Sequence, residues 1–152
     1  LATEAGLLDP HRTIQIGIRG AQNWADGWDY SRDVGMRVVF IEEFEQLGVD
    51  GVIAEARRVV GDGPTYLSFD IDSLDPVFAP GTGTPEIGGL TTREAQAILR
   101  GMKGVNLVGG DVVEVAPQYD ATTNTAQAGA QMLFEILSLM VFSPSIGAGK
   151  PS

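Results

Sequence analysis

The chain has 152 residues, 43% of them hydrophobic, which is enough for one globular domain with its own buried core. Its formal net charge of −10 disfavours nucleic acid or an anionic membrane surface as a partner, because both need a basic surface. The absence of cysteine excludes disulfides and thiolate metal ligands, and we therefore expect a cytoplasmic location.

The first residue and the last ten residues of the sequence each lead to a prediction. Leu1 stands where a complete product would begin with Met, and no signal-like segment follows it, so we expect a piece of a longer chain. Residues 143–152 are rich in proline and glycine, and this composition predicts a loose tail.

The first predicted strand covers Thr13 to Ile18, where isoleucines alternate with other residues. Just before it, His11 lies in a stretch that imitates part of an Asp-x-His-x-Asp metal motif. Thr13 replaces the final carboxylate and Pro10 marks a turn, so we interpret His11 as a surface histidine and not as a ligand.

An aromatic and acidic segment from Ala21 to Asp33 is predicted to be a loop or a short helix. The rings of Trp24, Trp28 and Tyr30 suit either a pocket for a cationic ligand or an anchor for the loop, and we favour the anchor. The elements predicted after it are a strand over 36–41, a short helix over 42–46, and a helix that Asp50 caps and that runs to Val60.

A strand that ends in carboxylates is the most informative part of the sequence. From Leu67 to Asp72 apolar and polar residues alternate, which predicts that Asp70 and Asp72 lie on one face. Both carboxylates can then reach one cation or a close pair of cations, whereas burying them without a cation would be costly. Asp75 precedes Pro76 and is predicted to stabilise a turn.

Two other binding motifs do not fit this region. The spacing of the acids after Asp70 does not match a calcium-binding loop, and no glutamate stands at the closing position. The glycines of residues 81–85 lack the third glycine of a dinucleotide motif and the lysine of a phosphate-binding loop.

The last third of the chain predicts a helix, a strand and a second helix. Thr91 to Glu94 has the pattern of a capping box, and the strand over 105–115 places Glu114 near its carboxyl end. The helix from Thr123 to Phe142 is apolar around most of its surface, apart from a polar stripe, so we expect protein to cover it. That stripe consists of Gln127, Gln131 and Glu135.

Strands that alternate with helices predict an α/β fold with a mainly parallel sheet and helices on both faces. Ligands of such sheets gather outside the carboxyl ends of the strands. Asp72 and Glu114 both belong to such ends, on different strands, so the sequence predicts a site there.

Two adjacent stretches resemble the second metal motif of the ureohydrolase family, which includes arginase and agmatinase. Residues 68–76 read Ser-Phe-Asp-Ile-Asp-Ser-Leu-Asp-Pro, and residues 80–85 read Pro-Gly-Thr-Gly-Thr-Pro. The resemblance implies a three-layer αβα, arginase-like fold, of which residues 1–142 would form the C-terminal half. It also implies hydrolysis of a guanidino compound to urea and an amine, and a homo-oligomer, either a trimer or a hexamer.

The same resemblance implies a binuclear manganese site and roles for four residues. Asp70 would bridge the two metals and Asp72 would bind one of them. Glu114 would bind the cationic guanidino substrate and, with the two aspartates, act in catalysis, while Thr84 would lie near the reacting group. The sequence around Glu114, Val-Glu-Val-Ala-Pro, is closer to agmatinases and guanidino-acid hydrolases than to arginases.

The first-half motifs of the family, Gly-Gly-Asp-His and Asp-x-His-x-Asp, have no counterpart in this sequence. We therefore expect activity to require the missing half. The alternative is a non-catalytic, truncated ureohydrolase module that acts in oligomerisation or regulation.

Overall fold

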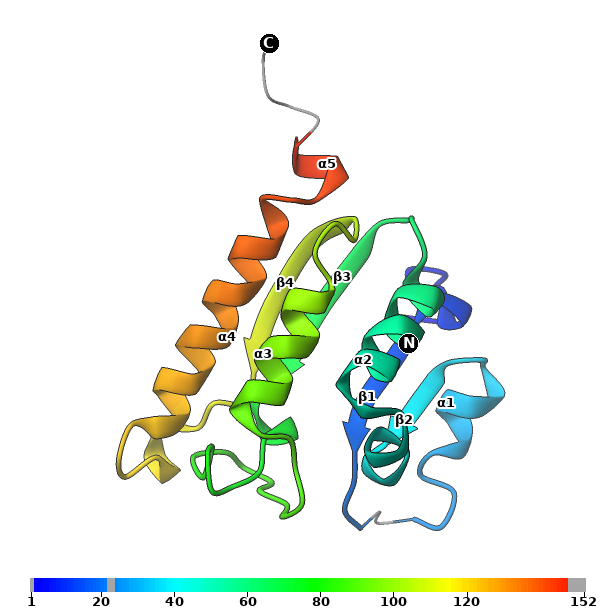
Figure 1. Cartoon of the computed structure of the whole chain (residues 1–152). Coiled ribbons are helices and arrows are strands. Elements are labelled where there is room, and N and C mark those ends of the chain that lie inside the picture. Colours follow the sequence, from blue (N-terminus) through cyan, green and yellow to red (C-terminus); the bar gives the residue numbers. More distant parts are fainter. Residues whose placement is uncertain (1, 22–23, 148–152) are drawn as a thin grey trace. The chain divides into compact units, whose positions relative to one another are not determined.

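The computed structural model describes residues 2–21 and 24–147 (Figure 1). The chain divides into two compact units, Leu1–Gly61 and Asp62–Ser152. Each unit contains one pair of parallel strands followed or flanked by helices, which confirms the predicted α/β class. No helix within the described residues is long and apolar enough to cross a lipid bilayer.

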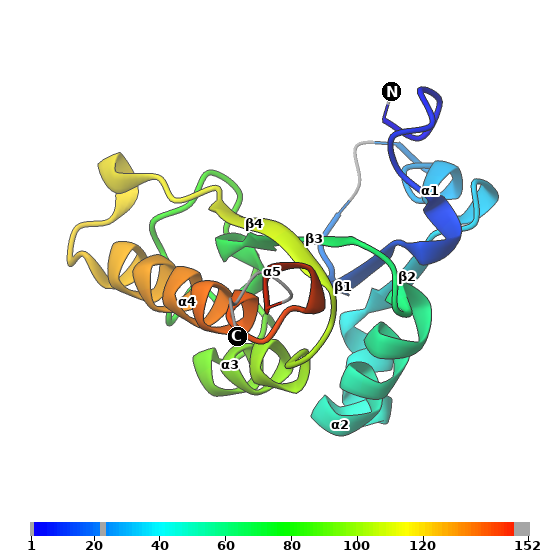
Figure 2. The same cartoon turned by 90° about the horizontal axis from the view of Figure 1, so that it is seen from above.

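The first unit is built on the parallel pair β1 (Ile14–Ile18) and β2 (Arg37–Phe40). A 3-10 turn precedes β1 at Pro10–Arg12, and α1 (Asp29–Asp33) lies beside β2. The long helix α2 (Ile41–Val60) packs against both strands (Figure 2). The apolar side chains between them form the core of this unit: Val38, Val39, Phe44, Val52, Ala56, Val59 and Val60.

Both predicted strands of this unit are confirmed, and so are the two predicted helical segments, which lie on either side of a break at Gly48 within α2. α2 is kinked at Gly48, whose φ of 65° a residue with a side chain rarely adopts. The prediction that Asp50 caps the second segment is wrong, because Asp50 lies inside α2 beyond the kink.

Two tryptophans of the aromatic segment differ in their contacts within the described part of the chain. Trp28 packs edge to face on Phe40, with 5.6 Å between ring centroids, as the anchor interpretation predicts. Trp24 is 75% exposed, so that interpretation is wrong for its ring in this chain. Gln22 and Asn23 lie outside the described residues.

An ion-pair network ties β2 to α2. The Arg37 guanidinium donates to the carboxylates of Glu43 and Glu55, and the Arg58 guanidinium donates to Glu55 at 2.7 Å. The guanidinium groups of Arg58 and Arg37 lower the pKa of Glu55 to about 2. Glu55 therefore stays ionised in the folded chain at pH values where an unfolded glutamate, with a pKa of about 4.3, takes up a proton.

We expect Glu55→Gln to lower the free energy of unfolding by about 1 kcal/mol at pH 7, because two partly exposed ion pairs are lost. The pKa is lowered on folding, so this stabilisation is fully present above about pH 4.3 and is lost as the pH falls toward 2. Urea unfolding of both chains at pH 7 and pH 3 measures the difference. Glu45→Gln, an exposed change on the same helix, is the control, and an equal loss at both pH values would contradict the ion-pair explanation.

The second unit is built on the parallel pair β3 (Thr65–Asp70) and β4 (Leu107–Val113). In their register Ser68 lies beside Asp111, and Asp70 lies beside Val113. The helices α3 (Thr92–Gly101) and α4 (Asn124–Met140) lie on the same face of this pair (Figure 2). The core between them is formed by Ile71, Leu74, Leu90, Leu99, Leu107, Met132 and Ile136.

The predicted capping box begins α3. The Thr91 hydroxyl accepts a hydrogen bond from the Glu94 backbone N–H, and the Glu94 carboxylate accepts one from the Thr91 N–H. Two backbone donors at the start of the helix are satisfied in this way, so the prediction is confirmed.

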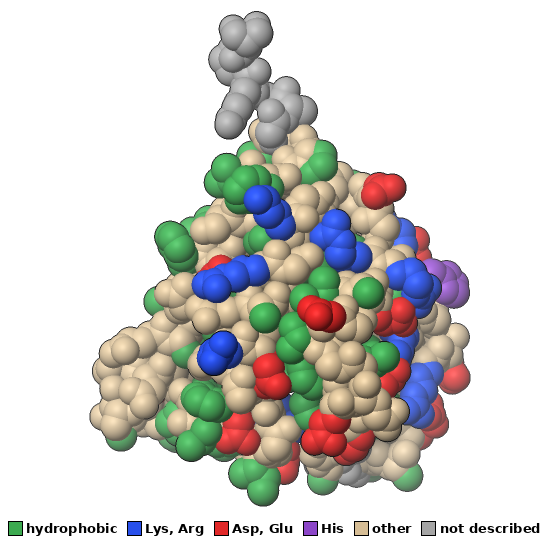
Figure 3. Space-filling view, viewed as in Figure 1, with side chains coloured by type: hydrophobic (Ala, Val, Ile, Leu, Met, Phe, Trp, Pro, Cys, Tyr) green, Lys and Arg blue, Asp and Glu red, His purple; other side chains and the backbone are tan. Residues whose placement is uncertain are grey.

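The predicted final helix is confirmed as α4, but its polar and apolar faces are not placed as expected. Glu135 is buried and accepts hydrogen bonds from the Arg100 guanidinium of α3, one of them at 3.0 Å. Large apolar side chains are exposed on α4 instead, and separate green side chains are visible at the edge of the molecule where α4 lies (Figure 3). They include Leu133, Phe134 and Leu137, and the exposed Val141 follows at the end of the helix. Gln127 and Gln131 of the predicted polar stripe are exposed as well. The prediction that protein covers this helix is therefore wrong within the described part of the chain.

Residues 143–147 are attached to the second unit. The Ser143 hydroxyl is buried and donates to the backbone carbonyl of Leu107 at 2.7 Å, and α5 (Pro144–Gly147) contacts β4. The remainder of the predicted tail, residues 148–152, lies outside the described residues. The division into a domain over 1–142 and a flexible tail stays a prediction.

Candidate functional site

The two loops that follow β3 and β4 leave the same end of this strand pair and lie side by side (Figure 1). The backbone N–H of Ala116, in the second loop, donates to the carbonyl of Gly81, in the first, at 2.9 Å. Parallel strands place their carboxyl ends together, so side chains about 45 residues apart in sequence can meet here. The predicted site residues belong to these loops and to the last residue of β3.

Asp70 and Asp72 adopt a different geometry from the one predicted. β3 ends at Asp70, and Ile71–Ser73 form a 3-10 turn, so strand alternation does not extend to Asp72. The Asp70 carboxylate accepts a hydrogen bond from the Asp72 backbone N–H at 3.1 Å, which holds the turn closed. Asp72 in turn accepts a hydrogen bond at 2.8 Å from the Thr84 hydroxyl. The expected common strand face is wrong, but the turn still keeps the two carboxylates close.

The pKa of Asp70 identifies a concentration of negative charge. Burial is the main cause that raises this pKa to about 6, and the nearby negative charges of Asp72 and Glu114 contribute to the rise. Asp72 and Glu114, which were predicted to lie at two different strand ends, are therefore both near enough to Asp70 to act on it electrostatically. A cation bound beside Asp70 would favour the ionised form of its carboxylate.

Glu114 is the first residue after β4, and its backbone is strained. It has φ of 63°, and besides Thr123 it is the only described residue other than glycine with a positive φ. This conformation costs a residue with a β-carbon on the order of 1 kcal/mol or more, and such strain concentrates at functional sites. Its side chain is exposed, with room for a ligand to reach it.

Asp75 has the structural role that was predicted. Its carboxylate accepts hydrogen bonds from the backbone N–H groups of Val77, Gly88 and Gly89, at 2.9, 2.8 and 3.2 Å. These bonds fold the long loop after β3 back on itself. Asp75 thus stabilises the loop through three backbone contacts, whereas Asp70 makes a single contact of this kind, with the Asp72 N–H.

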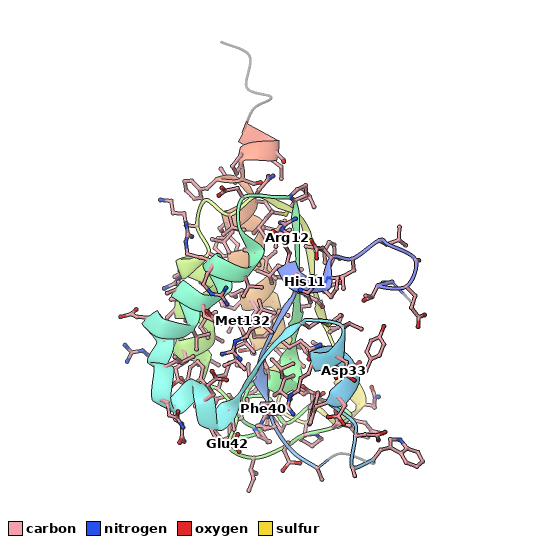
Figure 4. The ribbon with its side chains drawn as sticks, turned by 90° about the vertical axis from the view of Figure 1, so that its right-hand side faces the viewer. His11, Arg12, Asp33, Phe40, Glu42 and Met132 are labelled. Atoms are coloured by element: carbon pink, nitrogen blue, oxygen red, sulfur yellow. The ribbon has the colours of Figure 1, made fainter. Side chains whose placement is uncertain are left out.

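His11 lies in the first unit, on the 3-10 turn before β1 (Figure 4). It is exposed, as predicted, and its imidazole covers Gly35, where an added β-carbon would come within 2.4 Å of the ring. Within the described residues there is no group of three or more His, Asp or Glu side chains arranged to hold a metal ion. The second unit supplies a pair of aspartates, and not a closed set of ligands.

Two buried polar residues near the site were missed by the sequence reasoning. Asp120 and Thr125 bracket the start of α4, and Gly81 of the first loop packs against both. A weak signal was present, because an aspartate and a threonine just before an apolar helix are typical of helix starts. Nothing in the sequence indicated that they contact a loop about 40 residues earlier.

The arginase family model matches residues 1–138 of this chain. The chain belongs to the arginase family. It is 57% identical to guanidinopropionase of Pseudomonas aeruginosa over 147 residues, covering 97% of this chain and 46% of that protein. It is 53% identical to mitochondrial agmatinase of Gallus gallus, covering 90% of this chain and 40% of that protein.

A solved structure extends the similarity to three dimensions. Proclavaminate amidinohydrolase from Streptomyces clavuligerus matches with a TM-score of 0.89 and 44% identity, covering 93% of this chain and 47% of that one. The fold is therefore arginase-like, as predicted, and the relatives are guanidino or amidino hydrolases by name. The chain spans about half the length of these arginase-family relatives.

Proposed function

We propose that this chain is part of a ureohydrolase that cleaves a guanidino compound, of the agmatine or guanidino-acid type, to urea and an amine. The observation that carries the proposal is the convergence of Asp70, Asp72 and Glu114 at one end of the β3–β4 pair. The charges of Asp72 and Glu114 disfavour the ionised form of Asp70, and bound cations would offset this effect. A metal centre would supply positive charge beside Asp70 and Asp72, and a guanidinium substrate would supply it beside Glu114.

The donor atoms fit a hard divalent metal. Asp70 and Asp72 offer carboxylate oxygens, which suit manganese or magnesium, and we propose manganese, with Asp70 as the bridging and Asp72 as the terminal ligand. When bound, such metals lower the pKa of a coordinated water so that it can attack carbon near neutral pH. The Thr84 hydroxyl fixes one oxygen of Asp72 by its hydrogen bond, which supports a place for Thr84 beside the reacting group.

Glu114 is proposed to bind the guanidinium. Its side chain is exposed, separated from the turn of Asp70–Asp72 along the chain, and presented by a strained backbone. A carboxylate pairs with a planar guanidinium through two parallel N–H donors, which fixes the orientation of the substrate carbon. The names of the relatives, guanidinopropionase and agmatinase, support this class of substrate.

The complete site is proposed to need the part of the relatives that this chain lacks. Two aspartates cannot impose a closed geometry on two metal ions, so water near them would remain mostly protonated. We expect the purified 152-residue chain to release no urea from agmatine, guanidinobutyrate or guanidinopropionate, even with excess manganese. Co-expression with the unmatched part of Pseudomonas aeruginosa guanidinopropionase should restore urea release.

The two halves of this experiment test different statements. Urea release by the chain alone, with contaminating enzyme excluded by an Asp70→Ala preparation, would contradict the need for a missing half. The complex of this chain with the co-expressed part of guanidinopropionase is called the complemented complex below. If it folds and binds manganese but hydrolyses none of the three compounds, the proposed reaction is contradicted.

A second candidate function is a non-catalytic module that acts in oligomerisation. The exposed apolar side of α4 favours it, because side chains such as Phe134 and Leu137 are 63% and 56% exposed in this chain. Under either function we propose a cytoplasmic homo-oligomer, a trimer or a hexamer. Sedimentation of the complemented complex distinguishes these states.

A further inference from the structure

Gly81 is held between the two loops of the candidate site by buried hydrogen bonds. Its N–H donates to the Thr125 hydroxyl at 2.7 Å, and its carbonyl accepts from the Ala116 N–H at 2.9 Å. Thr125 is completely buried in the first turn of α4. One residue therefore joins the loop after β3, the loop after β4 and the start of the last long helix.

Gly81 packs closely against Asp120. A β-carbon added at Gly81 would lie 2.4 Å from the Asp120 β-carbon and 2.9 Å from its α-carbon, so no side chain fits there. Asp120 is 8% exposed, and its carboxylate accepts from the N–H groups of Thr125 and Ala126 at 3.2 and 2.9 Å. It thereby caps α4, whose N-cap residue Thr123 makes no side-chain cap hydrogen bond.

The chain on both sides of this junction is short. Two residues lie between Gly81 and Thr84, which donates to Asp72, and one residue lies between Glu114 and Ala116. A displacement at Gly81 therefore reaches both the Asp72 partner and the strained Glu114 backbone, with little intervening chain to absorb it. Gly81 therefore links the segment that carries Thr84, the partner of Asp72, to the segment that carries Glu114.

We propose that Thr125 and Asp120 are positioning residues that set the place of Glu114 relative to Asp72 by holding Gly81 between them. Neither residue would touch substrate or metal. The proposal rests on the proposed function for its effect on rate, but the junction itself is a property of this chain.

The test compares Thr125→Val, which keeps the shape of the side chain and removes the acceptor, with Thr125→Ser, which keeps the hydroxyl. In the complemented complex, Thr125→Val should lower kcat/KM about 10- to 100-fold, because a misplacement of about 1 Å is enough for such a loss. The KM for the guanidino compound should rise more than kcat falls, since Glu114 moves and the aspartates of β3 and its turn do not. Manganese content should stay within error of the unmodified complex, and Thr125→Ser should restore most of the rate.

Thr82 provides a matched control. It is 2% exposed, adjacent to Gly81, and its hydroxyl has no hydrogen-bond partner among the described residues. Thr82→Val makes the same chemical change beside the junction and should leave kcat/KM and KM within about twofold. An equal loss from Thr82→Val and Thr125→Val would overturn the assignment, as would a loss of manganese in step with activity.

A second measurement does not depend on the reaction. In the 152-residue chain, hydrogen exchange at the Gly81 amide should accelerate at least tenfold in Thr125→Val and return to the original rate in Thr125→Ser. An unchanged exchange rate in Thr125→Val would overturn the proposal that Thr125 holds Gly81, even if the complex proved to be a guanidino hydrolase. Faster exchange in a complex that hydrolyses no guanidino compound would leave the junction standing and refute the proposed function.

Discussion

Replacing Asp70 with alanine in the complemented complex is expected to remove manganese and to lower kcat/KM by about a thousandfold or more. The proposed bridging ligand would be lost, and metal coordination contributes several kcal/mol to transition-state stabilisation in enzymes of this kind. Metal analysis by mass spectrometry and urea release on the same preparation measure both effects. The change should not unfold the protein, because Asp70 makes one structural hydrogen bond, to the Asp72 N–H at 3.1 Å.

Asp75→Ala is the matched control, an aspartate of the same motif with a different task. It removes the acceptor of three backbone N–H groups, so it should lower the free energy of unfolding by about 1 to 3 kcal/mol while retaining manganese. Equal metal loss from the two variants would show that the turn, and not Asp70 itself, controls metal binding. Full metal occupancy in Asp70→Ala would remove it from the ligand set.

The features that could be predicted from the sequence are those that depend on neighbours in the chain. Alternating isoleucines before Arg19 and the Thr91–Glu94 capping box each follow from contacts within a few residues, and both are present. The turn-stabilising role of Asp75 was predictable for the same reason, because an aspartate before a proline favours a turn largely independently of distant residues.

The features that could not be predicted depend on partners far away in sequence. Glu135 is buried because Arg100, 35 residues earlier, meets it across two helices, and the helical period alone would place it in solvent. Asp72 leaves the strand pattern because a 3-10 turn begins at Ile71, and its carboxylate is then oriented by Thr84. The role of Asp120 likewise depends on its packing against Gly81, which lies 39 residues earlier in the chain.

Glu114→Gln should separate substrate binding from metal binding. The change keeps the shape of the side chain but removes the charge, and a charge-assisted hydrogen bond is about twice as strong as a neutral one. In the complemented complex we expect two manganese ions per subunit to remain while kcat/KM for the guanidino compound falls roughly 10- to 100-fold, or 1.4 to 2.8 kcal/mol. Steady-state urea release and metal analysis are the measurements, with the exposed change Glu45→Gln as the control for loss of one charge.

Glu114→Gly tests whether the strained backbone exists for the sake of the carboxylate. Glycine adopts the φ of 63° freely, so this variant should unfold at a higher temperature than the original protein, although it lacks the carboxylate and should be inactive. A variant that is more stable but inactive is expected where a strained conformation is retained for function.

The outcomes of Glu114→Gln decide the role of this residue. If manganese content fell with activity in Glu114→Gln, Glu114 would be a ligand or a support of the metal centre. If neither value changed, Glu114 would be an ordinary surface charge, and the argument for a guanidinium at this strand end would lose its principal residue.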